Sequence, residues 1–130
     1  MSIPDHTGQA CQIINITTEQ QLAAVCQLPK AIIYIEVDWS DHERQSRQTF
    51  HQALQCLPVQ EVPVFMIDCS GQQHDFFENW LITQERHVHL FYTGGYGETV
   101  LVQYGQVTDF INYPARSGLE KTTEKIKSWL

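Results

Sequence analysis

The chain has 130 residues, a length that suits a single domain built around one core. Apolar residues make up 42% of it and charged residues 18%, a composition typical of globular proteins rather than disordered ones. Its formal net charge is -7 and no basic cluster interrupts it, so polyanions such as nucleic acid and anionic membranes are poor partners.

The N-terminal stretch MSIPDHTGQACQ has neither a basic start nor an apolar segment, so it does not predict a secretory signal. The longest apolar run, over residues 31–37, is far too short to cross a bilayer. We therefore expect a cytoplasmic protein without membrane contact. We expect one domain over residues 1–130, with residues 1–10 as a loosely ordered N-terminal segment.

Hydrophobic periodicity predicts the elements in chain order. The sequence predicts a strand over residues 11–16, a helix over 18–28, a strand over 31–37, a helix over 41–56, a strand over 62–67, a helix over 72–86, strands over 99–104 and 107–113, and a helix over 119–130. The run AIIYIEV at 31–37 is almost continuously apolar, which indicates a central strand buried on both faces. Gly105 and Gln106 form the expected turn of a closing hairpin.

A recurring pattern supports these helix starts. A Ser or Thr followed three residues later by Glu or Gln can cap two free amide groups reciprocally. The pattern occurs at four expected starts: Thr18 with Gln21, Ser40 with Glu43, Ser70 with Gln73, and Ser117 with Glu120. The predicted order is therefore βαβαβαββα, an α/β fold in which helices cover both faces of a mixed central sheet, giving a three-layer sandwich.

This order, together with the segment IIYIEVDWSDHER, resembles the thioredoxin-like superfamily over most of the chain. In thioredoxins an apolar strand runs into Trp-Cys-Gly-Pro-Cys-Lys at the start of a long helix. The resemblance matches Trp39 to the tryptophan, Ser40 to the first cysteine, Asp41 and His42 to the Gly-Pro pair, Glu43 to the second cysteine and Arg44 to the basic residue.

The chain departs from the thioredoxin pattern in three ways. Both redox cysteines are replaced, Gly97 stands where the resemblance places the cis-proline, and the segment over residues 83–98 is longer than in a typical thioredoxin. Dithiol exchange needs a thiolate nucleophile and a resolving thiol, and Ser40 and Glu43 supply neither. We therefore expect no dithiol oxidoreductase activity and no cofactor.

The resemblance implies a non-redox thioredoxin-like module that binds a protein or peptide, as a monomer or weak dimer. Family members hold peptides across the tryptophan and the cis-proline loop. The residues expected to bind are Trp39, Ser40, Asp41, His42, Glu43, Tyr96 and Gly97. A plainer alternative is that Ser40 and Glu43 only cap a helix, while Trp39 and Tyr96 only pack in the core.

The alternative function is a thiol-dependent oxidoreductase, or a peroxide- or thiol-responsive protein, that uses Cys69. The four cysteines, at positions 11, 26, 56 and 69, form no CxxC pair, and buried inert thiols are the simplest expectation for them. Cys69, however, directly precedes the expected cap Ser70, and a helix N-terminus can lower the pKa of a thiol.

Metal binding by Asp41, His42, Glu43, His87 and His89 is a further alternative. His87 and His89 would share one face of a strand, but three consecutive helical residues point in different directions. The sequence therefore predicts no metal site.

Overall fold

The computed structural model describes residues 2–4, 10–57, 62–71, 73–84 and 94–130. The elements in chain order are β1 (Ser2–Pro4), β2 (Ala10–Ile16), α1 (Glu19–Val25), β3 (Ala31–Glu36), α2 (Asp41–Cys56), β4 (Val64–Asp68), α3 (Gln73–Ile82), β5 (Thr99–Gln103), β6 (Gln106–Ile111), α4 (Pro114–Ser117) and α5 (Leu119–Trp129). Every predicted strand and helix is present, although α1 and α3 are shorter than predicted.

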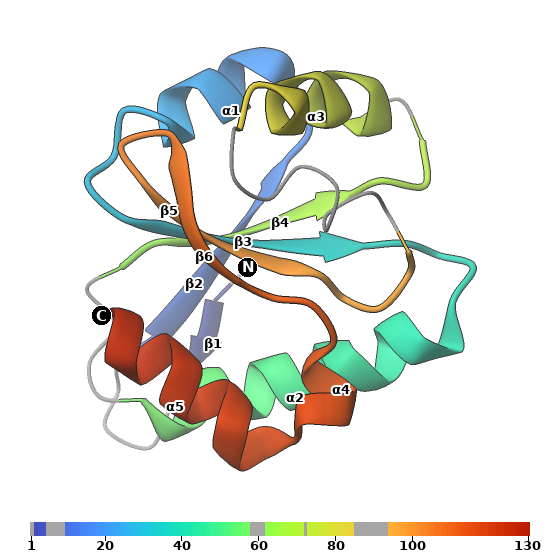
Figure 1. Cartoon of the computed structure of the whole chain (residues 1–130), viewed down its shortest axis with the longest axis vertical. Helices are drawn as coiled ribbons and strands as arrows, with labels where there is room; N and C mark the ends of the chain where they lie inside the picture. Colours follow the sequence, from blue (N-terminus) through green and yellow to red (C-terminus); the bar gives the residue numbers. More distant parts are fainter. Residues whose placement is uncertain (1, 5–9, 58–61, 72, 85–93) are drawn as a thin grey trace.

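The strands form one mixed sheet in the order β1-β2-β4-β3-β5-β6 (Figure 1). β4 runs parallel to both β2 and β3, as expected for strands joined by helical crossovers. β5 and β6 add the predicted antiparallel hairpin beside β3. The α/β three-layer prediction is therefore confirmed.

Two helical layers cover the sheet. α1 and α3 lie on one face, and α2, α4 and α5 lie on the other (Figure 1). The central strand β3 is buried on both faces, as predicted. Ile33 and Ile35 join the core beneath α1 and α3, whereas Ile32 and Tyr34 join the core beneath α2 and α5. None of the described helices is long and apolar enough to cross a membrane.

Two short elements were not predicted. β1 lies in the segment over residues 1–10 that we expected to be loosely ordered, and it pairs antiparallel with the start of β2. α4 starts with Pro114 at its first turn, a position that proline tolerates because the first amides of a helix have no helical partner. A helix of four residues has too little periodicity to be recognised from sequence.

The capping predictions had mixed outcomes. Thr18 and Gln21 form the predicted reciprocal box at α1. The prediction that Ser117 and Glu120 cap α5 was wrong, because Gly118 is the residue that precedes the helix, with a φ of 89°, and no side chain caps it.

The third predicted cap, Ser70, has a different partner. Its hydroxyl accepts a hydrogen bond from the Asp38 amide at 2.7 Å, and the side chain of its expected partner Gln73 lies outside the described residues. Ser70 therefore ties the segment after β4 to the segment after β3.

The packing beneath α2 can be tested at Phe50, which is fully buried and stacks on Tyr34 with ring centroids 4.8 Å apart. Phe50→Ala should lower the free energy of unfolding by about 3–5 kcal/mol in urea titrations, because it removes a large core side chain. Ile82→Ala, at a position that is 61% exposed, is the control and should cost less than about 0.5 kcal/mol. Similar costs for the two variants would contradict the described core.

Candidate functional site

The first turn of α2 carries a carboxylate into the interior. Glu43 is 0% exposed. Its Oε2 accepts hydrogen bonds from the Tyr34 hydroxyl at 2.7 Å and from Arg47 Nε at 2.9 Å. Its Oε1 accepts from the Val37 amide at 3.2 Å and from an Arg47 terminal nitrogen. Four donors therefore satisfy a buried anion, and Arg47 clamps it with two parallel bonds.

The neighbours of Glu43 keep their protons. Burial, followed by the hydrogen bond to Glu43, raises the pKa of the Tyr34 hydroxyl well above its usual range. The hydrogen bond to Glu43 is also the main reason that the pKa of Arg47 rises. Arg47 lies 3.6 Å from Glu36 as well, whose pKa is raised mainly by burial. The donors of this network therefore remain donors across the physiological pH range.

The predicted capping box at α2 is only half formed. The Ser40 hydroxyl accepts the Glu43 amide at 3.2 Å, as predicted. The Glu43 carboxylate does not return to the Ser40 amide, because the interior offers it Tyr34, Val37 and Arg47 instead. Glu43 therefore joins α2 to β3 rather than only closing the end of a helix.

Ser40 connects the start of α2 to the loop before β5. Its side chain is buried, and its hydroxyl donates a hydrogen bond to the carbonyl of Gly95. The position matched to the first redox cysteine thus holds a hydroxyl that accepts one hydrogen bond, from Glu43, and donates another, to Gly95.

A second buried carboxylate holds that loop. Glu98 is 1% exposed and accepts hydrogen bonds from the amides of Gly94 at 2.7 Å and Tyr96 at 3.2 Å. Burial raises the pKa of Glu98, and these amide donors oppose the rise. The Thr99 hydroxyl donates to the Gly97 carbonyl at 2.9 Å. Several polar backbone groups of residues 94–97 are therefore satisfied within the loop itself.

Glycine is required where this loop meets α2 and β3. Gly97 has a φ of +77°, and a Cβ there would lie 2.5 Å from the Tyr34 hydroxyl and from Ser46 Cβ. Gly95 has the same φ, and its Cβ would lie 2.6 Å from the Trp39 ring. No cis peptide bond occurs within the described segments, which agrees with a glycine at the position matched to the cis-proline.

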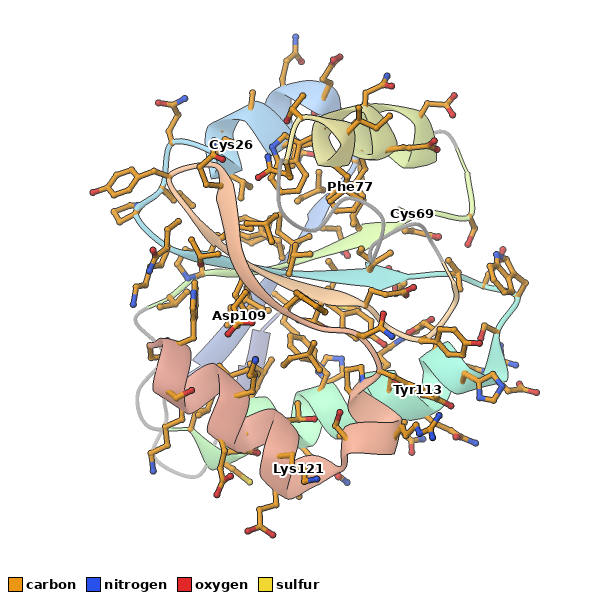
Figure 2. All side chains as sticks on the ribbon, viewed as in Figure 1. Cys26, Cys69, Phe77, Asp109, Tyr113 and Lys121 are labelled. Atoms are coloured by element: carbon orange, nitrogen blue, oxygen red, sulfur yellow. The ribbon has the colours of Figure 1, made fainter. Side chains whose placement is uncertain are left out.

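Four aromatic rings surround this junction. Trp39 is 60% exposed beside Gly95. Tyr96 follows Gly95 in the chain, and the rings of His42, Tyr96 and Tyr113 approach one another, with centroids 4.7 to 5.7 Å apart. His42 Nδ1 lies 2.6 Å from the Tyr113 hydroxyl. We call these four residues the aromatic surface; Figure 2 labels Tyr113, between β6 and α4.

An open hollow of about 640 Å³ adjoins the aromatic surface. Its lining residues are His42, Gln45, Tyr96, Asn112, Tyr113, Ala115 and Arg116. These residues come from α2, from the loop before β5 and from the segment around α4. The hollow therefore exists only because these three parts of the chain meet.

The seven residues expected to bind divide into two groups. Trp39, Asp41, His42 and Tyr96 lie at the surface, where Asp41 pairs with Arg44. Ser40, Glu43 and Gly97 lie beneath it and hold the loop and the helix in place.

Sequence reasoning missed Tyr113 and Arg116. The contact between Tyr113 and His42 joins residues 71 positions apart. No local pattern predicts such a contact.

Cys69 lies in the core beneath α1 and α3, on the face of the sheet opposite to α2 (Figure 2). Its side chain is buried, and the pKa of its thiol is raised to about 12, first by burial and then by the carboxylates of Asp68, Glu98 and Glu36. The predicted lowering of this pKa is therefore wrong, because desolvation and negative neighbours outweigh any helix terminus. Cys26 and Cys56 are free thiols too.

Within the described segments, no cluster of three or more His, Cys, Asp or Glu could hold a metal ion. Two residues of the metal alternative, His87 and His89, lie outside the described residues.

No family model matches the sequence, and no curated protein matches it. The structure is similar to human ERp44 in its zinc-bound form, with a TM-score of 0.63 and 14% identity over 90% of this chain and 31% of that one. It is also similar to thioredoxin from Malassezia sympodialis, with a TM-score of 0.61 and 13% identity over 98% of this chain and 90% of that one.

A third similar structure is thioredoxin f2 in complex with ferredoxin:thioredoxin reductase, with a TM-score of 0.59 and 12% identity over 91% of this chain and 94% of that one. The protein therefore has a thioredoxin-like fold. The resemblance suggested by the residues around Trp39 is confirmed at the level of fold.

The buried network predicts different costs for two arginines on the same helix. Arg47→Met leaves the Glu43 carboxylate buried without its cation and should cost about 2–4 kcal/mol of unfolding free energy, since Arg47 itself is partly exposed. Arg44→Met removes an exposed pair with Asp41 and should cost less than about 0.5 kcal/mol. Chemical denaturation of both variants measures this difference, and equal costs would refute the anchoring role of Glu43.

The burial of Cys69 predicts slow alkylation. At pH 8, iodoacetamide should modify the exposed Cys56 readily and Cys69 only in urea, because a thiol of pKa about 12 is almost entirely protonated there. The rate at Cys69 should rise about tenfold for each pH unit while the fold persists, since the thiolate fraction rises tenfold. Mass spectrometry of peptides from native and unfolded samples measures both rates. Equal native rates would restore the Cys69 alternative.

Proposed function

We propose that this protein is a non-redox thioredoxin-like binding module that holds an extended polypeptide segment of a partner on its aromatic surface. The observation that carries the proposal is the exposed Trp39 ring, which is seated against Gly95 at the end of a rigid, buried network. Exposed aromatic rings beside polar groups are characteristic of the residues that contribute most to protein interfaces.

The chemistry of the matched cysteine positions supports binding without dithiol exchange. Ser40 and Glu43 carry no sulfur, and both side chains are committed to hydrogen bonds inside the protein. No disulfide or exposed thiol pair is available beside Trp39 among the described cysteines. The alternative through Cys69 is disfavoured by the burial and the raised pKa of that thiol.

The loop over residues 94–97 indicates how a partner would be recognised. The amides of Gly94 and Tyr96 already donate to Glu98, and the carbonyl of Gly95 already accepts from Ser40. These groups are not free to form a strand-like ladder with a peptide. We therefore expect side chains, above all those of Trp39 and Tyr96, to make the main contacts with the bound peptide.

A protein with the same fold is known in complex with a protein partner. Thioredoxin f2 is seen in complex with a reductase, so at least one protein with this fold engages a protein partner. We also propose a cytoplasmic location, which suits the free thiols of Cys26, Cys56 and Cys69. A monomer or weak dimer stays a prediction.

A peptide selection tests the proposal. Random peptides displayed on phage would be selected against the intact chain, and the affinities of the selected peptides then measured by titration. Trp39→Ala should weaken them by about thirtyfold, as expected for an interface residue that contributes roughly 2 kcal/mol. The control Tyr104→Ala removes a ring that is 70% exposed in the β5–β6 turn and should change nothing.

Two results would contradict the proposal. One is unchanged affinity of the selected peptides for Trp39→Ala. The other is clear turnover in an insulin disulfide reduction assay that is lost in Cys69→Ser, because this would make the protein a thiol enzyme.

A further inference from the structure

We infer that the hollow beside the aromatic surface takes an acidic side chain of the bound polypeptide, with Arg116 as the residue that pairs with its carboxylate. This inference rests on the proposed function, because it names the chemistry of the partner at the same site. Three observations support it: the lining of the hollow, the unpaired charge of Arg116 among the described residues, and the contact of His42 with Tyr113.

The lining of the hollow contains no carboxylate. The chain as a whole has 15 acidic residues and 8 basic ones, so an acid-free hollow with an arginine differs from the average surface of this protein. Gln45 and Asn112 add amide groups that can donate hydrogen bonds. The polar groups of the hollow can therefore all serve an acceptor-rich anion.

The Arg116 guanidinium has no carboxylate partner within the described part of the chain, unlike the two arginines of α2. Arg44 pairs with Asp41, and Arg47 pairs with Glu43 and Glu36. Arg116 is exposed at the end of α4 and forms no such pair with a described residue. A guanidinium that lines a hollow without an internal carboxylate is available for the carboxylate of a ligand.

His42 is a second polar side chain that lines the hollow together with Arg116. Its Nδ1 lies 2.6 Å from the Tyr113 hydroxyl. This contact holds the imidazole ring against Tyr113, and which of the two groups donates depends on the tautomer of His42. In the tautomer whose Nδ1 accepts from Tyr113, Nε2 carries a proton that can be donated to an anion.

The walls of the hollow favour an apolar group next to the acid. The ring centroids of Tyr96 and Tyr113 are 4.7 Å apart, and both residues line the hollow together with Arg116. An aromatic side chain packs well against such rings. The fitting partner is thus a polypeptide segment in which acidic and aromatic residues are neighbours.

A matched pair of peptides tests this inference. One peptide alternates Glu with Phe, and the other alternates Gln with Phe, each labelled with a neutral dye for anisotropy titrations of the intact chain. The Glu peptide should bind about tenfold more tightly at low salt, the effect of one charge-assisted hydrogen-bonded pair. This preference should shrink as ionic strength rises.

Variants then assign the preference. Arg116→Gln should abolish it, and Arg116→Lys should keep part of it. The control Arg44→Gln, which loses only exposed contacts with Asp41 and Asp38, should leave it intact. No preference for Glu, or a preference that survives Arg116→Gln, would overturn the inference.

The same titrations separate the two proposals. If both peptides bind equally and both are weakened by Trp39→Ala, the binding module stands and the acidic preference fails. If neither peptide binds in a manner that depends on Trp39, both proposals fail for this class of ligand.

Discussion

A buried carboxylate is the constraint on which the site depends. Glu43 is fully enclosed, and an ionised carboxylate without partners costs several kcal/mol in such a place. Tyr34, Val37 and Arg47 offset that cost with four hydrogen bonds. Arg47 can do so because it lies one helical turn beyond Glu43. The network fixes the start of α2 against β3, at the position that the sequence resemblance matches to the second cysteine of thioredoxins.

The aromatic surface depends on this anchor through a short chain of contacts. The first turn of α2 presents Ser40, whose hydroxyl holds the carbonyl of Gly95. Glu98 secures the same loop from inside through two amides. Gly95 in turn supports the exposed ring of Trp39. Two buried carboxylates, Glu43 and Glu98, thus stabilise the small region that presents the aromatic surface.

The sequence predicted those features that local periodicity determines. The apolar run over residues 31–37 identified β3, and hydrophobic periodicity over residues 41–56 identified α2, because burial of apolar residues follows the period of each element. The role of Glu43 could not be predicted, since a local rule suggested a cap while the real partners depend on how α2 packs on β3. The contact between Tyr113 and His42 could not be predicted either, because only tertiary packing brings the two residues together.

A double-mutant cycle between Glu43→Gln and Arg47→Met tests the central claim most directly. The free energies of unfolding of the parent chain, both single variants and the double variant give the coupling between the two side chains. The account predicts a coupling of about 2 kcal/mol, because Arg47→Met leaves the buried Glu43 carboxylate without its cation, and this cost disappears when residue 43 is already Gln. A coupling indistinguishable from zero would show that Glu43 and Arg47 do not anchor the helix together, and would contradict the account.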